Sequence, residues 1–80
     1  MTVATLRLFG PARESAGVAR AELPGHSVAQ VLSSAQDLYG EAFKEIVAGS
    51  RIWLNGEPAS PESAVDDRDE VAVIPPVSGG

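Results

Sequence analysis

The sequence predicts one small domain of the α+β class, with a mixed sheet and a single main helix packed on one face. Its 80 residues are enough to close one modest core. Apolar residues alternate near both ends of the chain, as in strands, and recur at helical period in the middle. Strands on either side of one helix favour a sheet that carries the helix on one face.

The first strand is predicted over residues 2–9 (TVATLRLF), and its core-facing residues are Ala4, Leu6 and Leu8. Gly10-Pro11 ends this strand. Residues 12–16 have room for about one helical turn before Gly17. A second, shorter strand is predicted over residues 18–23, followed by a turn.

The main helix has the clearest local signal. Ser27 and Gln30 have the spacing of a capping box, which predicts a helix over residues 27–39. Its apolar stripe consists of Val28, Val31, Leu32, Ala35, Leu38 and Tyr39. Residues 41–47 predict a further short helix, with Ala42, Phe43, Ile46 and Val47 on one side.

The last third of the chain predicts a hairpin and a final strand. Residues 51–54 form a short strand, and Asn55-Gly56 is the dipeptide that best tolerates a tight hairpin turn. Residues 57–59 would return, and a polar connection over residues 60–69 leads to the last strand at residues 70–74. The predicted order of main elements is therefore ββαββ.

The charge of the chain limits its partners. Six Lys and Arg against eleven Asp and Glu give a formal net charge of -5, which disfavours nucleic acid and anionic membranes and favours a cationic protein partner. No signal-peptide pattern or membrane-spanning run is visible, so we expect a cytoplasmic protein.

Few side chains are suited to chemistry. There is no Cys, and His26 has no second ligand at metal-binding spacing. The acidic run at residues 66–70 contains Arg68 and lacks the spacing of a calcium loop. The hydroxyl groups have no His-based relay. We expect no bound metal or cofactor, and no nucleophilic catalysis by these side chains.

The last six residues, PPVSGG, differ from the rest. We expect a folded domain over residues 1–74 and a flexible tail over residues 75–80, namely Pro75, Pro76, Val77, Ser78, Gly79 and Gly80. Two prolines favour an extended path, and two glycines fit a narrow channel. Such a tail could deliver the Gly80 carboxylate to a partner. A frayed terminus without function fits these residues equally well.

A terminal Gly-Gly after a strand, on a ββαββ chain, resembles the ubiquitin-like β-grasp family. More narrowly, the segment Asp69–Gly80 resembles the end of the small sulfur-carrier subunits of molybdopterin synthase. Phe9-Gly10, Arg13-Glu14, Gly17 and Asn55-Gly56 match the family's strand exit, short helix and hairpin. Arg68 departs from the family, which commonly has Gly there, and would be strained if the turn requires a positive φ.

The resemblance implies a mechanism. An ATP-dependent adenylyltransferase, related to ubiquitin-activating enzymes, would activate the Gly80 carboxylate, and a sulfur donor protein would convert it to a thiocarboxylate. The large synthase subunit, expected in a heterotetramer with this chain, would supply the catalytic residues that transfer the sulfur to a cyclic pyranopterin precursor. Sulfur carriers of thiamine, cysteine or tRNA thiolation pathways, a ubiquitin-like protein modifier and a plain interaction module remain alternatives.

Strand alternation also predicts a docking surface. If the first and last strands are parallel neighbours, as in the β-grasp fold, Phe9 and Ile74 lie together beside the tail, on the face away from the helix. Trp53 is predicted on the same face, with Pro58 at its margin. We expect this surface to bind the partner.

Overall fold

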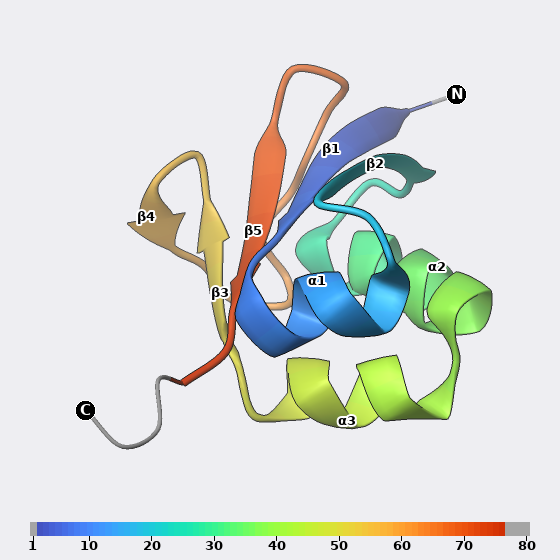
Figure 1. The fold of residues 1–80 in the computed structure, drawn as a ribbon. Helices are drawn as coiled ribbons and strands as arrows, with labels where there is room; N and C mark the ends of the chain where they lie inside the picture. The colour runs from blue at the N-terminus through green and yellow to red at the C-terminus, as the bar shows by residue number, and fades with distance from the viewer. Residues whose placement is uncertain (1, 77–80) are drawn as a thin grey trace.

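The computed structural model describes residues 2–76 and confirms the α+β class (Figure 1). Its elements are β1 (Val3–Leu8), α1 (Gly10–Ala16), β2 (Arg20–Pro24), α2 (Val28–Tyr39), α3 (Glu41–Ala48), β3 (Arg51–Leu54), β4 (Glu57–Pro58) and β5 (Glu70–Ile74). The predicted strands and helices are all present, with ends shifted by a few residues. The second strand begins later than predicted, at Arg20, and Val18 is exposed.

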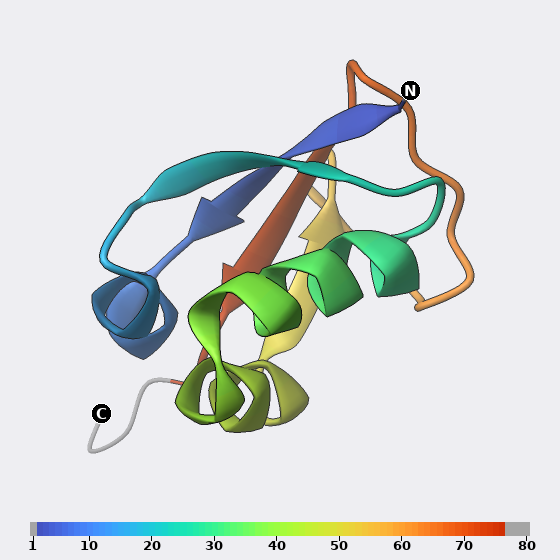
Figure 2. The same cartoon turned by 90° about the vertical axis from the view of Figure 1, so that its right-hand side faces the viewer.

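The five strands form one mixed sheet in the order β2-β1-β5-β3-β4. β1 and β5 pair in parallel at its centre, and the other neighbours pair antiparallel. Figure 2 shows the helices α2 and α3 on one side of this sheet. The opposite face, called here the open face, has no helix on it. No helix among residues 2–76 combines the length and the apolar character that crossing a membrane requires.

The core lies between the sheet and the helices. Ala4, Leu6 and Leu8 of β1 are buried, as the alternation predicts, and Leu6 and Leu8 pair with Val71 and Val73 of β5. The helices contribute the buried residues Ala12, Val28, Val31, Leu32, Ala35, Phe43 and Val47. Because consecutive strand residues point to opposite faces, this burial leaves the alternate side chains of β1 and β5 on the open face.

The start of α2 has the predicted cap with one difference. The Ser27 Oγ accepts a hydrogen bond from the Gln30 N–H at 3.2 Å. The Gln30 Oε1 accepts in return from the N–H of His26, at 2.7 Å, rather than from that of Ser27. Both side chains therefore satisfy backbone donors at this end of the helix.

The end of α2 corrects the predicted apolar stripe. Leu38 is 63% exposed, although it lies at helical spacing from the buried residues. The chain turns into α3 at Gly40, and the Phe43 ring, 5.1 Å from that of Tyr39, closes the core at this point. Leu38 remains outside that contact. Ala42 of the second stripe is also exposed.

The turn within the β3–β4 hairpin and the turn before β5 differ in backbone conformation. Asn55 and Gly56 both have positive φ, 52° and 84°, as a two-residue hairpin turn of this type requires. Arg68 has no positive φ. The Asp66 carboxylate instead accepts from the Arg68 N–H at 2.9 Å, and the Asp66 carbonyl accepts from the Asp69 N–H at 3.1 Å. The strain considered for Arg68 is therefore absent.

Candidate functional site at the open face of the sheet

The tail that the sequence predicts begins directly after β5. This strand ends at Ile74, and Pro75 is buried whereas Pro76 is exposed. Pro75, the first residue of the predicted tail, therefore packs against the domain. The remaining predicted tail residues, Val77, Ser78, Gly79 and Gly80, lie outside the described part of the chain.

Phe9 and Ile74 come together where β5 ends. Leu8 pairs with Val73, and Phe9 and Ile74 are the next residue of each strand. Phe9 keeps an extended backbone, with φ −129° and ψ 152°, before α1 begins. The two side chains are 39% and 36% exposed. This is the arrangement that strand alternation predicts for the start of the tail.

Trp53 extends the apolar surface across the sheet. It pairs with Ala72 of β5 on one side and with Pro58 of β4 on the other. Trp53 and Ala72 are half-buried, and Pro58 is exposed. Directly paired residues share a sheet face, so Phe9, Ala72, Trp53 and Ile74 form one apolar patch on the open face. Pro58 lies at the margin of this patch, as expected.

Three arginines surround the apolar patch, and sequence reasoning did not identify them. The Arg7 guanidinium lies over the Phe9 ring, 5.5 Å from its centroid, and its Nη1 is 3.7 Å from the Glu70 Oε1. Arg20 pairs directly with Arg7, and Arg51 with Ile74. Arg7 precedes Phe9 by two residues, so strand alternation could have placed it beside Phe9 on the open face. Arg20 could be placed only from the strand register.

A hydrogen-bond network fixes β5 beside the hairpin that carries Trp53. The Asn55 Nδ2 donates to the Asp69 carboxylate, and the Asn55 Oδ1 accepts from the Glu70 N–H, both at 2.9 Å. The Asp69 carboxylate also accepts from the Asp66 N–H at 2.9 Å. These bonds, that from Asn55 first, lower the pKa of Asp69 below its ordinary value of 3.8. The network thereby holds the register of the apolar patch.

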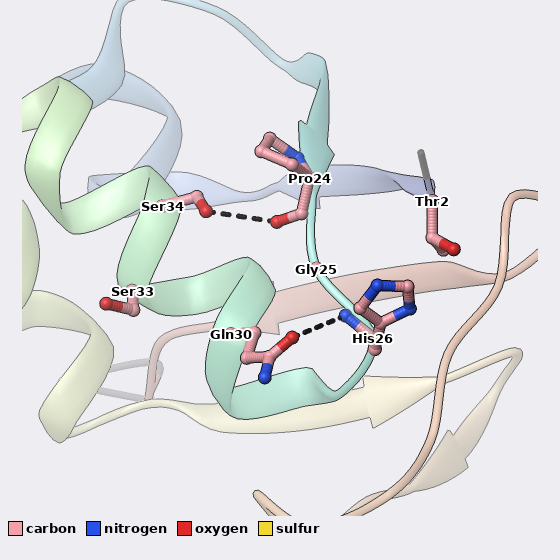
Figure 3. Close-up of a pocket in the computed structure, with 7 residues that line it drawn as sticks. All are labelled: Thr2, Pro24, Gly25, His26, Gln30, Ser33 and Ser34. Atoms are coloured by element: carbon pink, nitrogen blue, oxygen red, sulfur yellow. Dashed lines mark hydrogen bonds between the residues drawn. The ribbon is translucent and has the colours of Figure 1, made fainter.

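A surface depression of about 390 Å³ lies at the other end of the sheet, where β1 begins. Thr2, Pro24, Gly25, His26, Gln30, Ser33 and Ser34 line it (Figure 3). Its polar groups serve the local fold: the Ser34 Oγ donates to the Pro24 carbonyl at 3.0 Å, and Gln30 caps the helix. His26 is an exposed turn residue, as expected. Among residues 2–76, no three His, Cys, Asp or Glu side chains gather as metal ligands would.

The chain as a whole has counterparts among known proteins. The model of the ThiS family matches residues 6–80, which is nearly the whole chain and includes both terminal glycines. The chain belongs to the ThiS family. This membership confirms the resemblance to sulfur carriers of the β-grasp type.

Individual relatives of this ThiS-family protein come from plants and archaea. The molybdopterin synthase sulfur carrier subunit of Arabidopsis thaliana is 35% identical over 75 residues, which are 91% of this chain and 78% of that protein. The solution structure of small archaeal modifier protein 1 from Methanosarcina acetivorans is 31% identical, with a TM-score of 0.88, over 100% of this chain and 98% of that one.

A third relative is a putative subunit 1 of the molybdopterin converting factor from Pyrococcus furiosus. It is 28% identical, with a TM-score of 0.83, over 96% of this chain and 100% of that one. The ThiS-family protein thus shares its fold, over nearly the whole chain, with a protein named as a modifier and with one named as a converting-factor subunit.

Proposed function

We propose that this protein is the sulfur carrier of molybdopterin biosynthesis, with the reactive group at Gly80. The observation that carries the proposal is the 35% identity to the sulfur carrier subunit of Arabidopsis molybdopterin synthase, over nearly the whole chain. The family match that reaches residue 80 supports it, because it includes the Gly79-Gly80 pair.

The chemistry begins with activation of a carboxylate. A carboxylate is a poor electrophile, so a ubiquitin-activating-like adenylyltransferase first joins the Gly80 carboxyl oxygen to the AMP portion of ATP and releases pyrophosphate. A sulfur donor protein then supplies sulfur at the oxidation level of sulfide, which displaces AMP and leaves a thiocarboxylate. The 80 residues contain no Cys, so no side-chain thiol competes to carry the sulfur.

The second half of the reaction takes place on the large synthase subunit. The thiocarboxylate sulfur forms a bond to a carbon of the pyranopterin precursor as an oxygen substituent leaves that carbon, and water then hydrolyses the resulting thioester, which leaves the sulfur on the pterin and releases Gly80 as a carboxylate. The large subunit supplies the acids and bases, so the carrier binds no cofactor and is not an enzyme alone. Because activation consumes ATP, we assign the reaction to the cytoplasm.

The apolar patch is the docking surface in this proposal. Phe9 and Ile74 are partly exposed at the end of β5, directly before the tail residues in the sequence. A partner that covers them is positioned to receive the tail in its active site, in a channel that Gly79 and Gly80 would fit because they lack a Cβ. Partly exposed aromatic and aliphatic residues next to a reactive terminus are suited to this role.

Protein modification is the second candidate function. The observation that favours it is the 31% identity to a protein named small archaeal modifier protein 1, over the full length of this chain. A modifier uses the same activation but forms an amide with a lysine of its target. Carriers of thiamine, cysteine and tRNA thiolation pathways use the same thiocarboxylate and differ only in the acceptor.

Mass spectrometry of the intact protein tests the proposal. Incubation with ATP, the adenylyltransferase and a sulfur source should replace one oxygen by sulfur, and the change should map to the C-terminal peptide. Addition of the large subunit and the pyranopterin precursor should reverse the change. Stable amide adducts on other proteins, with no thiocarboxylate, would establish the modifier instead. A thiocarboxylate that the large subunit does not consume would indicate one of the other sulfur pathways.

A further inference from the structure

The charged residues next to the apolar patch differ in sign from the chain as a whole. Three arginines of the open face lie near the end of β5, and we call Arg7, Arg20 and Arg51 the arginine frame. They belong to the last two rows of side chains on this face, where a row is a set of paired residues that crosses neighbouring strands. One row runs Arg20, Arg7, Ala72, Trp53 and Pro58 across all five strands. The other holds Phe9, Ile74 and Arg51. Half of the six cationic side chains of the chain are therefore placed around the apolar patch.

Two charges of the arginine frame lower the stability of the free protein. Arg7 and Arg20 are directly opposite each other on antiparallel strands, where two like charges destabilise the pair. Glu70 offsets part of this cost through its ion pair with Arg7, although both side chains are nearly half exposed. Within residues 2–76, neither Arg20 nor Arg51 has a carboxylate within 4.0 Å. Among the described residues, no carboxylate therefore competes with an external acceptor for these two guanidinium groups.

The carboxylates of the open face are placed farther from the tail. The next row holds Glu22, Thr5 and Glu70 in direct register. The charge therefore changes from positive beside the tail to negative one row away, although the chain carries a net charge of -5. The net charge alone predicted a cationic partner. The register instead places cationic groups where a partner that receives the tail must bind.

We propose that the partner surface that covers the apolar patch carries carboxylates that pair with Arg20 and Arg51. Guanidinium groups bind carboxylates through two parallel hydrogen bonds, which fix orientation as well as contribute affinity. Phosphate would satisfy the same fork, but the other charges of the chain repel a polyanion, and the apolar patch requires an apolar surface in the centre of the contact. A protein with an apolar centre and an acidic rim meets both requirements.

Charge reversal on the frame tests this inference, which rests on the proposed function for the identity of the partners. The variants are Arg20→Glu and Arg51→Glu, and Arg68→Glu is the matched control. Arg68 is also exposed and changes the net charge equally, but it lies in the turn before β5, at the end of the sheet away from the tail. Each variant is titrated against the large synthase subunit and against the adenylyltransferase at two salt concentrations, and its unfolding in urea is measured.

The inference expects a local effect. Arg20→Glu and Arg51→Glu should each raise the Kd for at least one partner by about tenfold and reduce its salt dependence, with Arg68→Glu within about twofold of the wild type. If Phe9→Ala raises the Kd but Arg20→Glu and Arg51→Glu bind like Arg68→Glu, the inference is wrong, whereas the apolar patch is still supported as the docking surface. If the wild type binds neither protein, the inference and the proposed function both fall. Urea unfolding identifies any variant whose loss of binding results from a loss of folding stability.

Discussion

Truncation of Phe9 or Ile74 to Ala tests the docking patch, and the exposure of these residues sets the expected size. Burying a whole side chain of this kind stabilises by about 1.5–3 kcal/mol. Phe9 retains 39% of its surface and Ile74 36% for a partner to cover. The expected loss of binding is therefore about 0.6–1.2 kcal/mol for Phe9→Ala and about 0.5–1.1 for Ile74→Ala. For each variant this corresponds to a Kd raised about two- to eightfold.

The same substitutions also weaken the fold. The covered part of Phe9, about three-fifths of its surface, contributes roughly 0.9–1.8 kcal/mol to stability on the same scale. The expected losses of binding free energy and of folding stability are thus comparable. Calorimetric titration against the large subunit, well below the unfolding temperature of each variant, separates the two effects because the protein is then folded.

Leu38→Ala is the control for this experiment. Leu38 is 63% exposed, but it lies on α2, which packs against the other face of the sheet. Its truncation removes a similar apolar side chain from a position that the proposed partner does not reach. We expect the Kd of Leu38→Ala to equal that of the wild type. An unchanged Kd for Phe9→Ala and Ile74→Ala, or a loss as large in Leu38→Ala, would refute the reasoning.

Three further changes probe the tail and the fold. One residue appended after Gly80 should abolish thiocarboxylate formation in the mass assay while the urea unfolding curve stays unchanged, and full sulfur transfer by that variant would exclude Gly80 as the reactive end. Gly25→Ala should destabilise the fold by about 1–3 kcal/mol, because its Cβ would lie 2.7 Å from the Val31 backbone nitrogen; thermal unfolding at wild-type temperature would contradict this. Because the pKa of Asp69 is lowered in the folded state, its ionised carboxylate stabilises the fold at pH values above 3.8, the ordinary pKa. This stabilisation is lost as the pH falls through the lower pKa of the folded state. Asn55→Gly keeps a residue that tolerates the positive φ but removes hydrogen bonds between exposed groups, so it should cost about 0.5–1.5 kcal/mol at pH 7. It should also make unfolding less dependent on pH below 4, and an acid limb as steep as in the wild type would show that Asn55 does not control this titration.

Local chemistry accounts for what the sequence predicted correctly. Ser27 with Gln30 marks the start of α2 because each side chain can reach a backbone donor only a few residues away. Asn55-Gly56 marks the hairpin because few other residues tolerate positive φ. The alternation of Ala4, Leu6 and Leu8 fixed which face of β1 is buried, and from this the position of Phe9 followed.

The features that sequence reasoning missed depend on packing between distant segments. Leu38 has the spacing of a buried residue, but Phe43 closes the core from another helix. Arg68 avoids a positive φ because Asp66 accepts the hydrogen bonds of that turn. The arginine frame could not be seen because Arg20 faces Arg7 only once the register of β1 and β2 is known. Spacing along one segment gives a residue's face, whereas its neighbours across the sheet require the topology.

The position of β5 at the centre of the sheet has a consequence for how the protein is made. β1 and β3 are joined only through β5, which follows both of them in the chain. During synthesis, a nascent chain that lacks β5 can pair β1 with β2 and β3 with β4, but its sheet stays in two parts and its core lacks Val71 and Val73, so we expect folding to wait for nearly the last residues. A chain cut short before β5 would remain unfolded and exposed to proteases. Enzymes that act on the tail would therefore meet it almost exclusively on complete, folded molecules.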